Sequence, residues 1–259
     1  MYKFITYEVK HNIATVAINR PEVYNAVNNG VTYELQNAFE KIAQDEDVRV
    51  IVFTGVGKAF CAGQDLKAVM GDEKDSFENI LKKRYNPLIK QMRELPKPIV
   101  ARVNGVAAGA GCSLALACDI IVADEAAVFS EVFINIGLVL DSGSSYFLPR
   151  LVGSKKAFEF ASMANKIKGK EAAEMGIVNM AVPTEELDKA VSHYTEYYAK
   201  APTLAIGLMK QMLNKSGNAS LDEMLALETI NQEISGSSHD YEEGVNAFLE
   251  KRKPEFKGK

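Results

Sequence analysis

The middle of the chain contains the sequence Ile99-Val-Ala-Arg-Val-Asn-Gly-Val-Ala-Ala-Gly-Ala-Gly-Cys-Ser-Leu-Ala-Leu-Ala-Cys118. Its first five residues are mostly β-branched, which predicts a short buried strand over residues 99–103. Residues 104–111 are small and rich in glycine, which predicts a turn. Residues 112–118 then predict a helix, and residues 120–123 predict another strand. A strand, a turn, a helix and a strand in this order indicate an α/β fold.

The N-terminal part repeats this order of elements. Residues 6–9 and 13–18 alternate polar and apolar side chains around the turn at His11 and Asn12, which predicts a β-hairpin. Apolar residues at helical spacing predict a helix over residues 31–43, and a β-branched run predicts a strand over residues 48–54. The recurring β-β-α order suggests that the elements stack as successive turns.

The C-terminal part is predicted to be mostly helical. After Pro149 the pattern contains one short apolar strand, at residues 177–182. The helices are expected near residues 185–199, 203–214, 221–234 and 239–251. Because the architecture changes near residue 200, we divide the chain into a core, residues 1–199, and a helical C-terminal region, residues 200–259.

Composition excludes several classes of protein. The chain has 259 residues, of which 47% are hydrophobic and 25% are charged, as in an ordinary globular protein. The net charge is −4 and the basic residues are scattered, so nucleic acid is not an expected partner. No stretch reaches the length of a membrane span, and the N-terminus lacks the apolar run of a signal peptide. We therefore expect a cytoplasmic protein that does not associate with membranes.

The cysteines and histidines do not predict a metal site. The cysteines are three in number and lack CxxC spacing, which is typical of reduced thiols. The histidines lie far apart in the sequence, so no pair has the spacing of metal ligands. These residues are Cys61, Cys112, Cys118, His11, His193 and His239.

Two glycine-containing turns, at residues 60–66 and 107–113, each join a predicted strand to a predicted helix. Glycine and small neighbours allow a ligand to approach the main chain, and a helix N-terminus offers unpaired N–H groups. Two such donors directed at one oxygen form an oxyanion hole. The alternative is that both segments are simply tight turns, which are common in α/β folds.

The chain resembles the enoyl-CoA hydratase/isomerase, or crotonase, superfamily. The resemblance rests on three successive signatures, at residues 18–26, 60–66 and 104–111, and extends through residues 148–153 and 172–178. It implies a crotonase-like spiral of repeated β-β-α turns with a C-terminal helical region that makes trimer contacts. A homotrimer or a dimer of trimers is therefore expected.

The resemblance also implies an acyl-CoA site. The backbone N–H groups of Gln64 and Ala110 would bind the thioester oxygen, and their side chains would be incidental. Coenzyme A is then part of the substrate, and no separate cofactor or metal is implied. The residues that would contact the substrate are Val23, Ala62, Asp65, Leu66 and Gly109. The alternatives are that Val23 and Leu66 belong to the core and that Asp65 caps a helix.

The glutamates that characterise the hydratases of this superfamily are missing. Ser113 stands at the first position and Phe133 at the second. Addition of water to a double bond needs a group that takes a proton from water and a second group that assists, so this replacement disfavours hydration.

Asp141 is the remaining candidate base. Its segment, residues 136–143, resembles the loop of the catalytic aspartate in the oxepin-CoA isomerases of phenylacetate breakdown, although Leu140 and Ser144 depart from that pattern. One carboxylate suffices for a double-bond shift, since it can remove a proton and return it two carbons away. Apolar neighbours, Phe133 among them, are expected to raise its pKa by desolvation. The alternative is that Asp141 caps the following helix.

The sequence therefore predicts an acyl-CoA isomerase that uses a single carboxylate and an oxyanion hole. Glu131 is the rival base, but we interpret it as a solvated charge at the edge of a strand. The alternative functions are an enoyl-CoA hydratase with an unusual single acid, and a catalytically silent acyl-CoA-binding protein.

Overall fold

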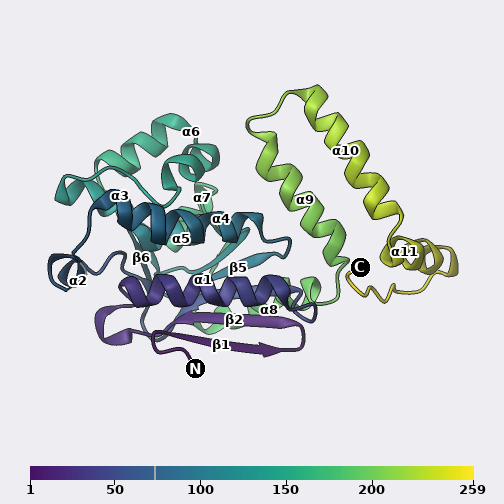
Figure 1. The fold of residues 1–259 in the computed structure, drawn as a ribbon, viewed down its shortest axis with the longest axis horizontal. Coiled ribbons are helices and arrows are strands. Elements are labelled where there is room, and N and C mark those ends of the chain that lie inside the picture. Colours follow the sequence, from purple (N-terminus) through teal and green to yellow (C-terminus); the bar gives the residue numbers. More distant parts are fainter. Residues whose placement is uncertain (73) are drawn as a thin grey trace.

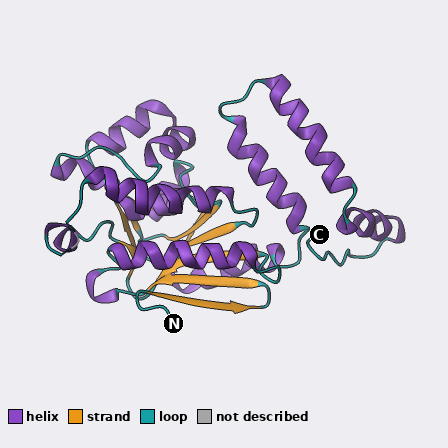
Figure 2. Ribbon diagram, in the orientation of Figure 1, coloured by secondary structure: helices purple, strands orange, loops and turns teal. Residues whose placement is uncertain are grey.

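The computed structural model describes residues 1–72 and 74–259. Its larger sheet has six strands in the order β1-β2-β3-β5-β7-β10, and only the hairpin β1–β2 is antiparallel. The strands are β1 (Ile5–Lys10), β2 (Ile13–Ile18), β3 (Val50–Gly55), β5 (Ile99–Val103), β7 (Ile120–Asp124) and β10 (Met180–Val182). These strands lie between layers of helices (Figure 2).

A second, smaller sheet contains four short strands in the order β4-β6-β8-β9. They are β4 (Ala59–Cys61), β6 (Val106–Ala108), β8 (Val128–Ser130) and β9 (Ile167–Lys168). The chain alternates between the sheets, since β3 is followed by β4, β5 by β6 and β7 by β8. This alternation is the predicted spiral of β-β-α turns.

The helices cover the sheets and continue beyond them (Figure 1). Those of the first 199 residues are α1 (Asn29–Gln44), α2 (Leu66–Met70), α3 (Phe77–Ile80), α4 (Asn86–Glu94), α5 (Ala110–Leu116), α6 (Ser144–Ser162), α7 (Gly169–Glu174) and α8 (Leu187–Tyr198). Short 3-10 turns are η1 (Pro21–Val23), η3 (Val132–Ile136) and η4 (Thr184–Glu186), and η2 (Leu81–Tyr85) is a π-helical turn. Among the described helices, none combines the length and apolar character needed to cross a bilayer.

The core fills the space between the larger sheet and the helices. α1 contributes a buried face, and its Phe39 packs edge-on against Phe53 of β3, with ring centroids 6.1 Å apart. Phe60 of β4 continues this row at 5.4 Å from Phe53. The aromatic row therefore links α1 to both sheets, immediately before the first glycine turn.

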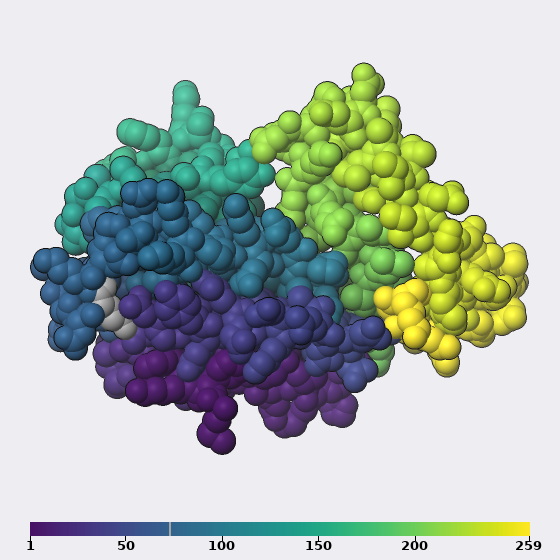
Figure 3. All heavy atoms as spheres, in the orientation of Figure 1, coloured from purple at the N-terminus to yellow at the C-terminus, as the bar shows by residue number. Residues whose placement is uncertain are grey.

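A helical region follows the spiral and projects to one side of it (Figures 1 and 3). It contains α9 (Thr203–Ser216), α10 (Leu221–Gly236) and α11 (His239–Glu250). A groove of about 770 Å³ lies between α6 and α9, lined by residues that include Tyr146 and Leu213.

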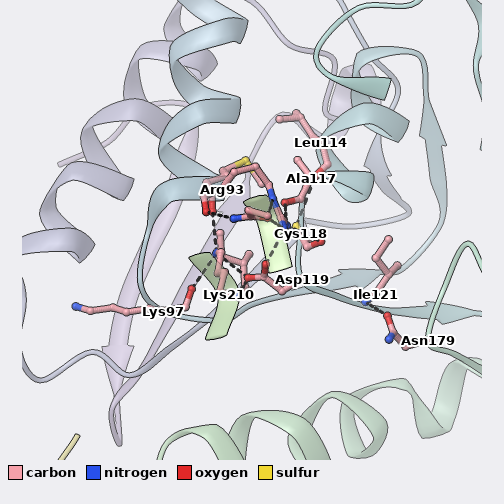
Figure 4. Close-up of polar contacts among 12 residues, drawn as sticks. Arg93, Lys97, Leu114, Ala117, Cys118, Asp119, Ile121, Asn179 and Lys210 are labelled. Carbon is pink, nitrogen blue, oxygen red and sulfur yellow. Dashed lines mark hydrogen bonds and ion pairs between the residues drawn. The ribbon is translucent and has the colours of Figure 1, made fainter. Parts of the chain in front are cut away.

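Buried charges hold α9 on the spiral (Figure 4). The ammonium of Lys210, a buried residue of α9, lies 2.7 Å from the carboxylate of Asp119. The same carboxylate pairs with Arg93 of α4 at 2.9 Å. Removal of one partner from a buried ion pair leaves an uncompensated charge, which is unfavourable. The cluster therefore fixes the position of α9 against the spiral.

The strands and helices that the sequence predicts agree with the structure, but α6 and several short elements were not predicted. The strands β4 and β6 replace parts of the predicted turns, because three residues are too few to show the alternating pattern that identifies a strand. Between α3 and α4 the chain forms η2, a π-helical turn, which has no reliable signature in sequence.

Candidate functional site

The two glycine turns lie side by side at the ends of β4 and β6, which are parallel neighbours. Gly63 has a φ of +94°, and a Cβ atom there would lie 2.7 Å from the carbonyl oxygen of Ala108 and 3.5 Å from the amide nitrogen of Ala110. A Cβ atom on Gly111 would lie 2.1 Å from the carbonyl oxygen of Cys61. Only glycine fits at either position, because the backbones of the two turns are in contact there.

Each turn presents a backbone N–H to which the described residues provide no hydrogen-bond acceptor. The carbonyl of Gly63 and the N–H of Asp65 both bond to Val27, which leaves the intervening N–H of Gln64 without a partner in the described residues. Ala110 is the first residue of α5, where N–H groups have no partner within the helix. Its neighbour Gly109 has a φ of +50° and donates its own N–H to the carbonyl of Ser130.

The side chain of Gln64, which the resemblance does not involve in oxygen binding, makes hydrogen bonds that hold its turn in place. Its Oε1 accepts hydrogen bonds from the Tyr85 hydroxyl at 2.7 Å and from Nη2 of Arg84 at 3.2 Å. Its Nε2 donates to the carbonyl of Val27 at 2.8 Å. Arg84 and Tyr85 come from the π-helical turn η2, and both are buried. The turn that carries the Gln64 N–H is therefore clamped, which sequence reasoning missed because no motif marks this pair.

Asp65 is the N-cap of α2, as the alternative interpretation predicted. Its carboxylate accepts a hydrogen bond from the N–H of Ala68 at 3.2 Å and pairs with Arg20 at 3.0 Å. Burial pushes the pKa of Asp65 upward, but the Ala68 N–H and the Arg20 guanidinium outweigh it and hold the pKa below its usual value. The Arg20–Asp65 pair joins the first signature segment to the second.

The predicted contact residues Val23, Ala62 and Leu66 lie close in sequence to the Arg20–Asp65 ion pair. The N–H of Ala62 bonds to the carbonyl of Tyr24, directly after η1, and Val23 at the end of η1 is half-buried. Leu66 is 48% exposed, so its interpretation as a core residue is wrong. An exposed leucine beside a glycine turn is available to a ligand.

Asp141 lies in the loop between η3 and α6. The hydroxyl of Ser142 donates to its carboxylate at 2.7 Å. Burial raises the pKa of Asp141, and the Ser142 hydrogen bond opposes this only in part. The N-cap of α6 is Gly143, and no side chain caps this helix. The alternative that Asp141 is a helix cap is therefore wrong, because its backbone carbonyl, not its carboxylate, bonds to the N–H of Ser144.

Ser113, at the first hydratase position, connects Asp141 to the second glycine turn. Its buried hydroxyl lies 3.2 Å from the carbonyl oxygen of Asp141 and 3.3 Å from that of Gly109, and it can donate to either. Phe133, at the second hydratase position, is 8% exposed, and its ring lies 3.8 Å from where a Cβ atom of Gly109 would be. An alcohol and an aromatic ring thus replace the two carboxylates.

Glu131 is 0% exposed, so its interpretation as a solvated charge is wrong. Apart from the thiol of Cys112, which faces it, its carboxyl oxygens have no hydrogen-bonding partner in the described residues. The pKa of Glu131 is raised to about 8, mainly because of burial; the Cys112 thiol opposes this rise and the charge of Asp141 adds to it. Sequence alone could not show this, because residue 131 follows a three-residue strand whose covered face depends on distant helices.

The site combines two adjacent turns, each with a backbone N–H that has no partner in the described residues, and the partly buried carboxylate of Asp141. Residues 8–259 match the sequence model of the enoyl-CoA hydratase/isomerase family. This chain belongs to the enoyl-CoA hydratase/isomerase family. The 1,2-epoxyphenylacetyl-CoA isomerase of Escherichia coli is 37% identical to it over 262 residues, with 100% of both chains covered.

Other members of the enoyl-CoA hydratase/isomerase family are named as hydratases. A "Probable enoyl-CoA hydratase" of Rhodobacter capsulatus is 41% identical, with 100% of this chain and 99% of the relative covered. The crystal structure of an enoyl-CoA hydratase from Bacillus anthracis has a TM-score of 0.94 at 29% identity, with 99% of this chain and 100% of that chain covered. Membership of the family therefore does not by itself choose between isomerisation and hydration.

Proposed function

We propose that this enzyme shifts a double bond next to a coenzyme A thioester, with Asp141 as the only proton carrier. The observation that carries the proposal is the partly buried carboxylate of Asp141, whose loop Ser113 ties to the second glycine turn. The same Ser113 occupies a position where a hydratase would carry a glutamate. The loop of the proposed base is therefore tied to the helix that begins at the Ala110 N–H, and both glutamates of a hydratase are replaced.

The proposed reaction has two proton transfers. The N–H groups of Gln64 and Ala110 bind the thioester oxygen, and Asp141 removes a proton from the acyl chain. The electron pair of that C–H bond moves into a dienolate, whose negative charge the two donors stabilise. Asp141 then returns the same proton two carbons along, so the product is an isomer and nothing is consumed.

Desolvation of Asp141 suits it to this task. An aspartate with an ordinary pKa, about 3.9, is a weak base at neutral pH. Burial raises the pKa of Asp141, which brings its proton affinity nearer to that of a useful base. Val132 and Phe133, which lie near Gly109, would make the acyl side of the site apolar. This lining and the Escherichia coli relative support an aromatic or other apolar acyl group, as in phenylacetate catabolism.

Hydration with a single acid is the second candidate, and the Rhodobacter capsulatus relative favours it. The experiment is incubation of the enzyme with a 3-enoyl-CoA, and separately with a 2-enoyl-CoA, in buffered deuterium oxide. Formation of 2-enoyl-CoA from the 3-enoyl-CoA supports isomerisation, and its new C–H bond should carry deuterium only to the extent that Asp141 exchanges its proton with solvent before returning it. Formation of 3-hydroxyacyl-CoA without a bond shift supports hydration, and binding without either reaction supports a silent acyl-CoA-binding protein.

We also propose that three copies assemble through the C-terminal helical region. This region leaves many apolar side chains exposed for its size, which a partner would cover. They include Met209, Leu213, Leu221, Leu225, Ile230, Ile234, Phe248 and Leu249.

A further inference from the structure

Glu131 is a buried carboxyl group that the proposed reaction does not use. It stands between β8 and η3, directly after Ser130, whose carbonyl accepts the N–H of Gly109. It is therefore adjacent in the chain to the residue that supports the second glycine turn. The thiol that faces it belongs to Cys112, two residues after the proposed donor Ala110.

The surroundings of Glu131 favour a neutral carboxylic acid. Its side chain is 0% exposed, and no ion pair of the described residues includes it. A buried carboxylate is stable only when cations or several strong donors compensate its charge. A thiol is a weak donor and cannot do so alone. The titratable groups that face Glu131 are Cys112 from α5 and Asp141 from the loop before α6, and neither is a cation.

We propose that Glu131 is a positioning residue of the same site, a carboxylic acid kept neutral so that Asp141 is the only charged carboxylate there. The inference rests on the isomerase function proposed above. In the reaction, one negative charge moves from Asp141 to the thioester oxygen at the N-terminus of α5. A second negative charge at Glu131, against Cys112 of the same helix, would oppose the dienolate and would hold the proton on Asp141.

The proposal predicts a second ionisation in the pH dependence of turnover. The pKa of Glu131 is raised to about 8, so its ionisation falls on the alkaline side. Above that pH the wild-type turnover should fall about tenfold per pH unit, because each unit increases the ratio of ionised to neutral Glu131 tenfold. Glu131→Gln, which keeps the shape but cannot ionise, should lose this fall. The ratio of its turnover near pH 9 to that near pH 7 should be about tenfold higher than in the wild type.

A matched variant separates Glu131 from its neighbour. Cys112→Ser keeps a donor beside Glu131 but replaces the ionisable thiol, so the alkaline fall should persist in it. An alkaline fall that disappears in Cys112→Ser and persists in Glu131→Gln would assign the ionisation to the thiol and overturn the proposal. Glu131→Met, which is also uncharged and similar in size, repeats the test if Glu131→Gln does not fold.

A spectroscopic measurement tests the proposal without reference to turnover. Infrared difference spectra of wild type and Glu131→Gln near pH 7 should contain the C=O stretch of one protonated carboxylic acid in the wild type alone. A carboxylate band in its place would show that Glu131 is ionised and would overturn the proposal. If no isomerase activity is found but the acid band is present, the proposed reaction fails while the neutral state of Glu131 stands.

Discussion

The hydroxyl of Ser113 lies 3.2 Å from the backbone carbonyl of Asp141, and this contact joins the helix after the oxyanion turn to the loop of the candidate base. Ser113 follows Ala110 by three residues on α5, so one short helix carries the proposed donor and also contacts the loop of the proposed base. Catalysis requires that the base and the charge-stabilising donors keep a fixed separation. We therefore propose that Ser113, at a position where a hydratase has a glutamate, acts by positioning the Asp141 loop.

Ser113→Ala should loosen the Asp141 loop without removing a reacting group. We expect the free energy of unfolding to fall by about 1 kcal/mol, the usual net contribution of one hydrogen bond. The kcat for a 3-enoyl-CoA should fall about tenfold with little change in KM, because the base is displaced while CoA contacts remain. Ser113→Thr keeps the hydroxyl and should recover most of the lost kcat. Equal loss in both variants would mean that the contact does not position Asp141.

Asp141→Asn should abolish proton transfer. The amide has the same shape but cannot accept a proton, so turnover should fall by about 10²–10⁴. The carboxylate does not cap α6, and thermal unfolding should therefore change little. The measurement is steady-state kinetics with 3-enoyl-CoA, beside titration of a non-reactive acyl-CoA to confirm binding. Glu131→Gln assayed near pH 7 is the comparison, and a dead Glu131→Gln beside an active Asp141→Asn would transfer the base to Glu131.

Gln64→Ala should lower kcat, because it loosens the turn that carries the proposed oxyanion donor. The substitution removes the acceptor of the Tyr85 hydroxyl and of Arg84, so the turn loses its clamp. Removal of a whole oxyanion donor costs about 10²–10³ in kcat, and we expect a loss somewhat below that range, because the backbone N–H itself remains. Tyr85→Phe removes one of the clamping bonds and should give a smaller loss. A Gln64→Ala enzyme with wild-type kcat would show that the clamp has no part in the reaction.

Glu131 should make the stability of the folded protein depend on pH. Its pKa is raised from 4.5 to about 8 on folding, so the folded chain holds a proton that the unfolded chain releases. Stability from this group is fully present below about pH 4.5 and is lost as pH rises to about 8, with a slope of up to about 1.4 kcal/mol per pH unit. Denaturant unfolding at several pH values measures this slope. Glu131→Gln should reduce it, and an unchanged slope would mean that other groups cause it.

The C-terminal region should govern assembly. Light scattering of the full chain at micromolar concentration should give the mass of a trimer or of two trimers. Phe248 and Leu249 are exposed side by side at the end of α11, and Phe248→Glu with Leu249→Lys should shift the mass toward the monomer. Glu242→Lys on the same helix alters charge without removing apolar surface and serves as the control. A wild-type monomer would contradict the proposed assembly.

Much of the fold was predictable because it depends on local patterns. The bounds of β2 and β5 agree with the predicted strands, since alternation or a β-branched run is visible within the segment itself. The two glycine turns were predictable as well, because no other residue type satisfies the close backbone approach at Gly63 and Gly111. The sequence also identified the family to which the chain belongs, whereas the role of Asp141 stays a prediction.

The burial, pKa and hydrogen-bond partners of single side chains could be read only from the tertiary structure. Sequence could not distinguish a solvated Glu131 from a buried one, nor a capping Asp141 from one whose carboxylate is free of the helix. It could not show that Arg84 and Tyr85 clamp Gln64, which lies about twenty residues earlier in the chain. Local pattern determines which residues form a strand or a turn, whereas burial, pKa and hydrogen-bond partners depend on contacts between distant segments, which only the folded chain creates.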